Sequence, residues 1–262
     1  SKAAKEAGLK VAISGLGGDE LLSGYPSFLD LPRWHRRFGP LAAMPGAGFL
    51  ARKLMAAVAP AFSRVTPKAL GVLEYSGSWA GTYLLRRGLF LPHELPGVMD
   101  PEIAREGLRR LRPLRRLAAN LTPDPSSDVA RVCVLESAQY MRNQLLRDAD
   151  WAGMAHSLEI RVPLVDFTLL RALAPVIPVL TPRAGKAALA NAPSSPLPNE
   201  IVTRAKTGFS VPTGDWINAA IRRGSDPVGR APEPKGLVSR RWSSTVLNGI
   251  QPANAQPQLH AS

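Results

Sequence analysis

A short apolar run that gives way to glycines and then to acidic residues is the part of this chain best suited to chemistry. The run Val11–Ile13 predicts a buried strand, residues 14–18 predict a tight turn, and Asp19 begins a predicted helix. The turn contains three glycines, Gly15, Gly17 and Gly18. Glycine allows positive φ and close backbone approach, so successive N–H groups and the helix N-terminus can face an anion. The pattern therefore predicts a phosphate site.

Two acidic residues follow the turn and would repel a bare phosphate. Asp19 and Glu20 make better sense as ligands of a Mg²⁺ ion bound to that phosphate, because Mg²⁺ prefers carboxylate and phosphate oxygens. The alternative is an ordinary strand, turn and helix, in which glycine serves the turn and the acids favour the helix dipole. The spacing alone leaves both interpretations open, since the loop is neither GxGxxG nor a Walker A motif.

A second candidate group lies in the segment HSLEIRVPLVD at 156–166. In an extended segment Glu159 and Arg161 share one side, while the apolar residues at 158, 160 and 162 share the other. A structural ion pair between Glu159 and Arg161 explains this pattern as well as a substrate site does. Asp166, at the end of the segment, is predicted to cap a helix over 167–173.

A third candidate is Lys206, on the glycine-containing segment Lys206–Phe209, which is flexible enough to close over a ligand. A lysine so placed can neutralise negative charge that develops on phosphate oxygens during a reaction. Arg204 is a candidate helper. Without further support, however, Lys206 is one of many surface lysines.

Helices must position most of these residues, because the chain beyond the glycine loop is rich in Ala, Leu and Arg at helical spacing. Ser127 and Asp128 are predicted to begin a long helix with a stripe that changes from apolar at Val132 to polar at Asn143. Its C-terminal end is therefore expected to meet a wet surface. The strand at 11–13 needs parallel neighbours to satisfy its backbone, and none is evident downstream. We expect the rest of the sheet to be encoded upstream.

The length and composition of the chain limit which classes of protein it can belong to. At 262 residues with 45% hydrophobic content, the chain is long enough for one large or two small domains. Its net charge of +13 would attract anions such as ATP, nucleic acid or acidic lipid. The single Cys133 excludes a disulfide framework, the four histidines lack zinc-ligand spacing, and no signal peptide is evident, so a cytoplasmic location is expected. Prolines, glycines and charges interrupt the apolar stretch at 38–62, so no membrane span is expected.

The densest positive patch is the segment RRLRPLRR at 109–116. Nucleic-acid binding is one hypothesis for it. The other is a solvated pair of helices broken at Pro113, which is favoured because no recognised nucleic-acid motif accompanies the patch.

Three stretches, in the same order along the chain, resemble the asparagine synthetase family of ATP-dependent amide-forming enzymes. They are SGLGGDELLSGYPSF at 14–28, RNQLLRDADWAGMAHSLEIRVPLVD at 142–166 and LPNEIVTRAKTGFSVP at 197–212. The first resembles the second nucleotide-binding loop of the family, and the third contains a match to its RxKxGF-type loop. Long motifs in a shared order are far more specific than one glycine-rich loop, and this resemblance extends to about Trp216.

The resemblance implies an α/β fold of the adenine-nucleotide alpha-hydrolase-like, pyrophosphate-loop type, here mostly helical with only a remnant of the parallel sheet. Family members carry an N-terminal glutaminase domain and a first pyrophosphate loop, SGGxDS, and this sequence contains neither. Residues 1–217 are therefore predicted to be a partial synthetase domain. Residues 218–262, which end in a run rich in Pro, Gln, Ala and Ser, are predicted to be a poorly ordered C-terminal region.

The resemblance also implies roles for the candidate residues, with ATP and Mg²⁺ as cofactors. The nucleotide contacts would be Ser14, Gly15, Gly17 and Gly18. Asp19 would bind the metal and Lys206 would assist adenylate formation. Glu159 would orient the incoming amine and Arg161 would bind the carboxylate of the substrate. The reaction would join a small carboxylate to ammonia from a glutamine-hydrolysing domain or subunit, or to another amine. Its outcome would be asparagine biosynthesis or amidation of a related acid.

One position departs from the family pattern. Asparagine synthetases carry an acid between the glycines that correspond to Gly15 and Gly17, where this chain has Leu16, which cannot transfer a proton. The departure favours an acid other than aspartate as the substrate. Two alternatives from other classes stay open: a non-catalytic remnant or partner subunit, and a basic nucleic-acid-binding module. The leading interpretation expects no specific nucleic acid or membrane partner and leaves a homodimer open.

Overall fold

The structure is a computed structural model that describes most of the chain. The described residues are 1–42, 44, 46–58, 67–182, 184–195 and 197–204, together with 212, 214–216, 219, 239–240, 243 and 246. Among them, no helix is long and apolar enough to cross a membrane.

A small parallel sheet carries the glycine loop. Helix α1 (Lys2–Glu6) precedes strand β1 (Val11–Ile13), and β1 pairs in parallel with β2 (Glu159–Arg161) across almost 150 residues of sequence. The register places Val11 opposite Glu159 and Ile13 opposite Arg161. The described sheet has these two strands, and the chain leaves β1 through the one-turn helix α2 (Gly18–Leu21).

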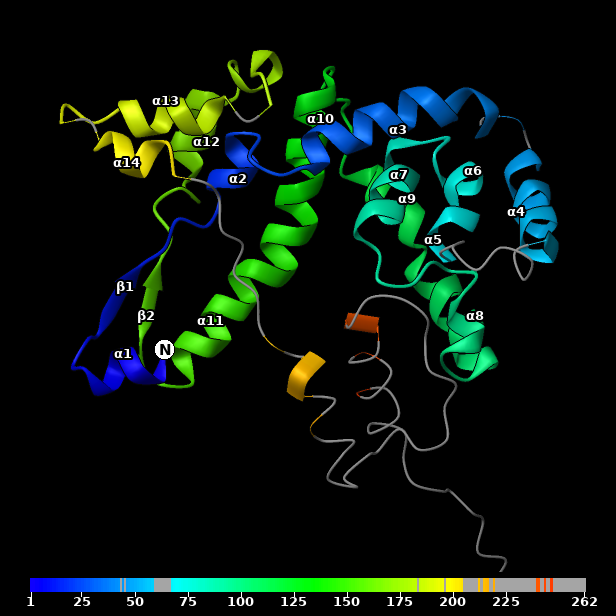
Figure 1. The fold of residues 1–262 in the computed structure, drawn as a ribbon, viewed down its shortest axis with the longest axis horizontal. Helices are drawn as coiled ribbons and strands as arrows, with labels where there is room; N and C mark the ends of the chain where they lie inside the picture. The colour runs from blue at the N-terminus through cyan, green and yellow to red at the C-terminus, as the bar shows by residue number, and fades with distance from the viewer. Residues whose placement is uncertain are drawn as a thin grey trace, which may run out of the picture.

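A bundle of helices forms the other side of the molecule (Figure 1). Its members, in chain order, are α3 (Ser27–Ala42), α4 (Ala47–Val58), α5 (Pro67–Leu70), α6 (Val72–Tyr75), α7 (Trp79–Arg87), the 3₁₀ turn η2 (Leu95–Gly97), α8 (Pro101–Leu111) and α9 (Pro113–Ala119). Helix α3 packs on α6 and α7, and α7 packs on α9. The predicted break at Pro113 is confirmed, because α8 ends at Leu111 and α9 begins at Pro113.

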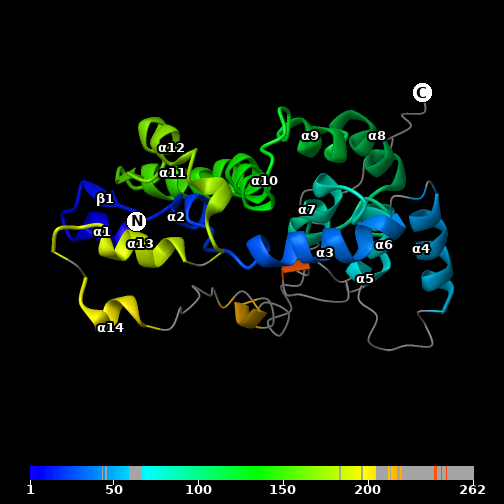
Figure 2. The same cartoon turned by 90° about the horizontal axis from the view of Figure 1, so that it is seen from above.

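One long helical segment runs between the sheet and the bundle, as the two perpendicular views show (Figures 1 and 2). It consists of α10 (Asp128–Leu135), the π-helix η3 (Glu136–Leu145) and α11 (Leu146–Met154). The predicted cap is confirmed: the Ser127 hydroxyl accepts a hydrogen bond of 3.1 Å from the Ala130 N–H. The stripe also changes as expected, from buried Val132 in α10 to exposed Asn143 in η3.

Four short elements follow β2 in the described residues up to 204. They are α12 (Phe167–Leu173), the 3₁₀ turn η4 (Ile177–Val179), α13 (Gly185–Asn191) and α14 (Asn199–Val202). The predicted cap of α12 is confirmed, because the Asp166 carboxylate accepts a hydrogen bond of 2.8 Å from the Leu169 N–H.

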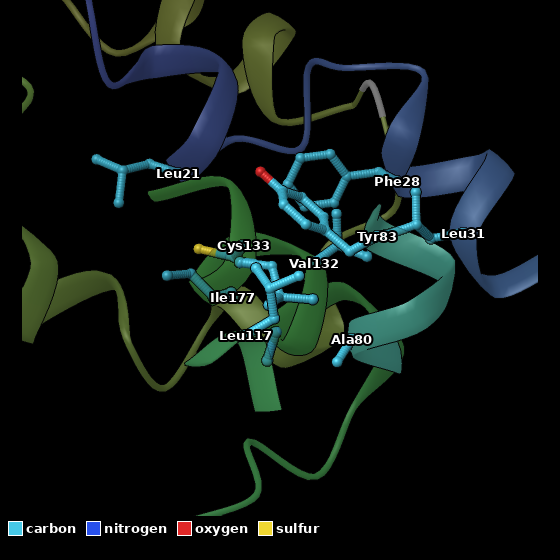
Figure 3. Packing of buried hydrophobic residues seen from close by; sticks show 11 residues of the cluster. Leu21, Phe28, Leu31, Ala80, Tyr83, Leu117, Val132, Cys133 and Ile177 are labelled. Atoms are coloured by element: carbon cyan, nitrogen blue, oxygen red, sulfur yellow. The ribbon is translucent and has the colours of Figure 1, made fainter. Parts of the chain in front are cut away.

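The main core lies where α2, α3, α7, α9, α10 and η4 meet (Figure 3). Phe28 and Leu31 of α3 and Val132 and Leu135 of α10 are almost wholly buried there. Burying a side chain of this size contributes about 1.5–3 kcal/mol relative to leaving it exposed. The core therefore belongs to the bundle and the long helical segment, with little contribution from the sheet.

The prediction that residues 11–13 form a buried strand is wrong in its burial. The strand is present, but Val11 is 37% exposed and Ile13 is 78% exposed. A two-stranded sheet has few neighbouring elements to cover it, and the described residues leave Ile13 in particular open to solvent. The chain is mostly helical with a remnant of a parallel sheet, as expected, whereas the alpha-hydrolase-like fold itself stays a prediction.

Candidate functional site

The glycine loop follows directly from the carboxyl end of β1. The backbone N–H of Ser14 donates to the Arg161 carbonyl at 2.8 Å, which extends the β1–β2 ladder by one residue. The N–H of Gly18 then donates to the Gly15 carbonyl at 3.2 Å and closes the turn. Since β1 and β2 are parallel, the glycine loop and the segment after Arg161 leave the same edge of the sheet.

Two glycines of this loop pack tightly against another segment, and the third is exposed. Gly17 has φ of 92°, and a Cβ on it would lie 2.9 Å from Val165 Cγ2 and 3.2 Å from the Leu164 carbonyl oxygen. Gly18 is also buried, and a Cβ there would lie 3.1 Å from Leu164 Cδ1. Gly15, in contrast, is exposed, and a Cβ added to it would meet nothing within 4 Å. The loop is thus held against residues 164–165 on one side and open at Gly15.

The two acidic residues after the loop have different surroundings. Glu20 is 1% exposed and points into the molecule, where the Tyr25 hydroxyl donates to its Oε1 atom at 2.9 Å. Burial raises the pKa of the Glu20 carboxyl, and the nearby charges of Asp19 and Glu136 raise it further. Asp19 is only half-buried. Of the two acids predicted as metal ligands, Glu20 therefore forms an internal hydrogen bond and is buried away from the surface.

A preformed metal cage is absent from the described part of the chain, where no group of three His, Cys, Asp or Glu side chains converges. Mg²⁺ commonly keeps several waters and takes only one or two carboxylates from a protein when it is bound with phosphates. A metal role for Asp19, next to the glycine turn, stays a prediction.

A buried ion pair that the sequence analysis missed lies between α7 and η3. The Arg87 guanidinium contacts both carboxylate oxygens of Glu136, with Nε to Oε1 at 3.1 Å and Nη2 to Oε2 at 2.9 Å. Glu136 is wholly buried, and the Tyr83 hydroxyl also donates to it at 3.2 Å. Burial lowers the pKa of Arg87, but the Glu136 carboxylate outweighs this effect and leaves it raised.

Aromatic rings connect this ion pair to the glycine loop. The Arg87 guanidinium carbon lies 3.8 Å from the ring centroid of Tyr140 and 5.1 Å from that of Tyr25. The Tyr25 and Tyr140 rings meet edge to face at 5.7 Å, and Tyr25 in turn binds Glu20. The polar stripe of the long helix, which includes Glu136 and Tyr140, was the only sequence signal that indicated this network.

Glu159 and Arg161 are exposed and form an ion pair, with Arg161 Nε donating to Glu159 Oε1 at 2.8 Å. This pair lowers the pKa of the Glu159 carboxyl and raises that of Arg161. Both side chains lie on the same side of β2 and the adjacent Leu158 is buried, as the alternation predicts. The structural interpretation of the pair therefore has direct support, and a substrate role stays a prediction.

Arg161 and Glu159 differ in their distance from the glycine loop. Arg161 pairs with the last residue of β1, so it lies at the edge from which the loop leaves. Glu159 pairs with Val11, two residues further back. It lines a cavity of about 230 Å³ between α11 and β2, where Asp150 supplies a second carboxylate.

Lys206 and the rest of the 206–209 segment lie outside the described residues. Arg204, the candidate helper, is exposed just before them. The structure thus brings together Ser14, Gly15 and Arg161 at one sheet edge, with Asp19 in the helix that follows the loop. The position of Lys206 relative to them stays a prediction.

Comparisons with known proteins identify the family of this chain. The family model described as asparagine synthase matches residues 1–236. The chain is 28% identical over 224 residues to asparagine synthetase [glutamine-hydrolyzing] 1 of Bacillus subtilis, covering 79% of this chain and 31% of that protein. It is also 28% identical over 222 residues to a putative asparagine synthetase [glutamine-hydrolyzing] of Mycobacterium tuberculosis, covering 80% and 31%. The matched region is thus about a third of the length of these relatives. No solved structure gives a significant match.

Proposed function

Because this chain belongs to the asparagine synthase family, we propose that it carries the second nucleotide-binding loop and the acceptor side of an ATP-dependent amide-forming enzyme. The observation that carries the proposal is that the glycines of the loop have different surroundings. Gly17 and Gly18 are pressed against residues 164–165, while Gly15 is exposed and faces open space. Such a loop is fixed in place yet leaves backbone N–H groups free to approach a phosphate.

Asp19 is the residue that would hold Mg²⁺, which would reduce the negative charge on the phosphates of ATP during attack. Ser14 and Gly15 would contact the nucleotide on the same side of the loop. Glu20 has another role in this proposal: through Tyr25, it connects the loop to the buried Arg87–Glu136 pair and so fixes the position of α2.

The chemistry that we propose has two steps. A carboxylate oxygen of the substrate attacks the α-phosphorus of ATP, the bond to pyrophosphate breaks, and an acyl-adenylate forms. The nitrogen of ammonia or another amine then attacks the acyl carbon, loses a proton, and displaces AMP. Lys206 would neutralise the charge that develops on the departing pyrophosphate.

The acceptor side of the proposed site is the segment that contains Arg161 and Glu159. Arg161 lies at the edge of the sheet from which the glycine loop leaves, and it would bind a carboxylate of the substrate. The new contact would replace the ion pair that Arg161 forms with Glu159. The small cavity that Glu159 and Asp150 line is acidic, which suits an amine better than an anion. Leu16 replaces the acid expected in the loop, so we propose amidation of an acid related to aspartate, with aspartate itself as the comparison substrate.

The direct test is binding of Mg²⁺·ATP to the 262-residue chain, measured by isothermal titration calorimetry. Gly15→Val should weaken binding by about tenfold or more, because the new side chain fills the open side of the loop without meeting protein atoms. Asp19→Asn should weaken binding only when Mg²⁺ is present. Gly97→Val is the matched control, since Gly97 also has open space around it and lies in the bundle.

Exchange of labelled pyrophosphate into ATP, with aspartate and related dicarboxylates, tests the chemical step. Lys206→Ala should reduce the exchange by about tenfold or more, while the exposed Lys53→Ala on α4 should not change it. A folded chain that neither binds Mg²⁺·ATP nor supports exchange would overturn the proposal and favour the remnant or partner-subunit alternative.

A further inference from the structure

Helices α8 and α9 lie in the bundle, on the other side of the long helical segment from the β1–β2 sheet (Figures 1 and 2). They meet at Arg112, which has φ of 46° and ψ of 59°. A non-glycine residue in this left-handed conformation costs on the order of 1 kcal/mol. The unfavourable corner places arginines of both helices around one depression.

That depression has a volume of about 450 Å³ and a lining that is mostly arginine. Its lining residues are Arg109, Arg110, Leu111, Arg112, Arg115, Arg116 and Ala119. Glu106 forms ion pairs with Arg109 at 2.7 Å and with Arg110 at 2.5 Å. Among the described residues, no acidic side chain pairs with Arg112, Arg115 or Arg116. In the part of the chain that the structure describes, one carboxylate thus pairs with two of the five guanidinium groups, and the remaining positive charge favours an anion.

A larger cavity, of about 560 Å³, adjoins the arginine depression, and Arg116 and Leu111 line both. Its walls come from α7, α9 and the π-helix η3, an unusual helix type that is frequent at functional sites. The volume lies within the range of small-molecule sites, about 300–1,000 Å³.

The larger cavity is lined by a stacked arginine and tyrosine on one part and by side-chain amides on another. Arg87 stacks on the Tyr140 ring at 3.8 Å and is already neutralised by Glu136, so the inner end carries little net charge. Three side-chain amides, those of Gln139, Asn143 and Gln144, also line the cavity. Amides can donate and accept hydrogen bonds, while the Leu84 and Leu117 side chains supply apolar contact. Such a lining suits a planar, uncharged group.

We propose that the two cavities together form a binding site for a small phosphorylated molecule with an aromatic body. The phosphate lies among Arg112, Arg115 and Arg116, where guanidinium groups bind phosphate oxygens through charge-assisted hydrogen bonds. The ring enters the larger cavity beside Tyr140 and the three amides. This site is separate from the glycine loop and does not depend on the function proposed for that loop.

Phenyl phosphate is the probe, because it carries both parts of the proposed ligand. Inorganic phosphate has the charge without the ring, and phenol has the ring without the charge. Titrations of the 262-residue chain, followed by NMR chemical shifts and calorimetry, should rank phenyl phosphate tightest. Arg116→Gln should raise its Kd by about tenfold, because Arg116 lines both cavities and no described acidic side chain pairs with it, so its charge is available to the phosphate.

The matched control is Arg105→Gln, which removes an equal charge from an exposed residue of α8 that lines neither cavity. Gln144→Ala separates the two parts of the site: it should weaken phenyl phosphate about threefold or more and leave inorganic phosphate unchanged. Gly15→Val should leave all three titrations unchanged, which distinguishes this site from the proposed nucleotide loop.

Two results would overturn the proposal. One is equal weakening by Arg116→Gln and Arg105→Gln, which would show a diffuse charge effect. The other is tight, steeply salt-dependent binding of a single-stranded oligonucleotide by a chain that does not discriminate phenyl phosphate from inorganic phosphate, which would assign the patch to nucleic acid.

Discussion

The helical bundle and the β1–β2 sheet of this chain are built in opposite ways. The bundle and the long helical segment packed on it bury Phe28, Leu31 and Leu135 to 1% exposure or less, and together they bury the Glu136 side chain completely. The sheet has three residues in each strand and leaves Ile13 78% exposed. Apolar burial therefore stabilises the bundle, whereas the sheet edge is held by a short ladder and by the fit of Gly17 against residues 164–165.

This difference shows that the helices supply most of the stability, whereas the candidate ligand contacts lie beside the sheet. The candidate nucleotide loop follows the sparsely buried sheet and is exposed at Gly15. Helix α2 anchors the loop to the rest of the protein, because Leu21 packs in the main core and Glu20 accepts a hydrogen bond from Tyr25. Changes in the bundle should thus act on global stability, and changes at the loop should act locally.

The largest expected effect is the loss of the buried ion pair. Arg87→Met leaves the wholly buried Glu136 carboxylate without its cation and should lower the free energy of unfolding by about 3–5 kcal/mol. Urea unfolding followed by circular dichroism measures this change. Arg86→Met on the same helix removes a partner of the half-exposed Asp30, at 3.1 Å, and should cost about 1 kcal/mol or less. Equal costs for the two variants would contradict the prediction.

A cavity in the core should come next. Leu135→Ala removes a side chain that is 0% exposed in α10 and should destabilise the chain by about 2–5 kcal/mol. The control, Leu170→Ala on α12, changes a leucine that is 42% exposed and should stay within about 0.5 kcal/mol of the parent chain. If thermal unfolding gave the two variants the same melting temperature, the bundle would not be the stabilising part.

Gly17 tests how the loop is held. Gly17→Ala would place a Cβ 2.9 Å from Val165 Cγ2 at a positive φ, so it should cost about 1–3 kcal/mol, mainly by loosening the loop and the 164–165 segment. Hydrogen exchange of the loop amides should increase more than that of α10. Gly15→Ala, where the new methyl group meets nothing, should change stability by about 0.5 kcal/mol or less. Faster exchange throughout α10 in Gly17→Ala would count against a local role.

The smallest effect concerns the pH dependence that Glu20 contributes. Its pKa is raised by burial, with added repulsion from Asp19 and Glu136, so its neutral form is favoured in the folded chain. Its stabilising contribution is therefore present below the ordinary pKa of 4.5 and is lost as pH rises through the raised value. Glu20→Gln, which keeps an acceptor for Tyr25, should flatten this fall and raise stability at pH 7 by about 1 kcal/mol. A variant with the same pH profile as the parent chain would show that Glu20 does not titrate there.

Local features of the sequence predicted the local structure well. The strand, turn and helix order around the glycine loop, the caps at Ser127 and Asp166, and the helix break at Pro113 all depend on residues within a few positions of each other. The wrong expectation was burial of the strand, because burial depends on which other strands and helices cover it. The Arg87–Glu136 pair was missed because its two members are 49 residues apart, and neither stands out among the many arginines and acids of the chain.

The sequence by itself determined the chemical inventory: a glycine loop followed by acids, a Glu159–Arg161 alternation, and an arginine-rich segment before and after Pro113. Residue type and short-range spacing are enough for such patterns, because caps, turns and strand alternation are local properties of the backbone. Only the tertiary structure decided that Glu20 faces Tyr25 inside the protein while Asp19 stays near the surface. It alone placed Arg116 between two cavities. Those outcomes depend on packing between segments far apart in the chain, where the free energy of burial outweighs local preference.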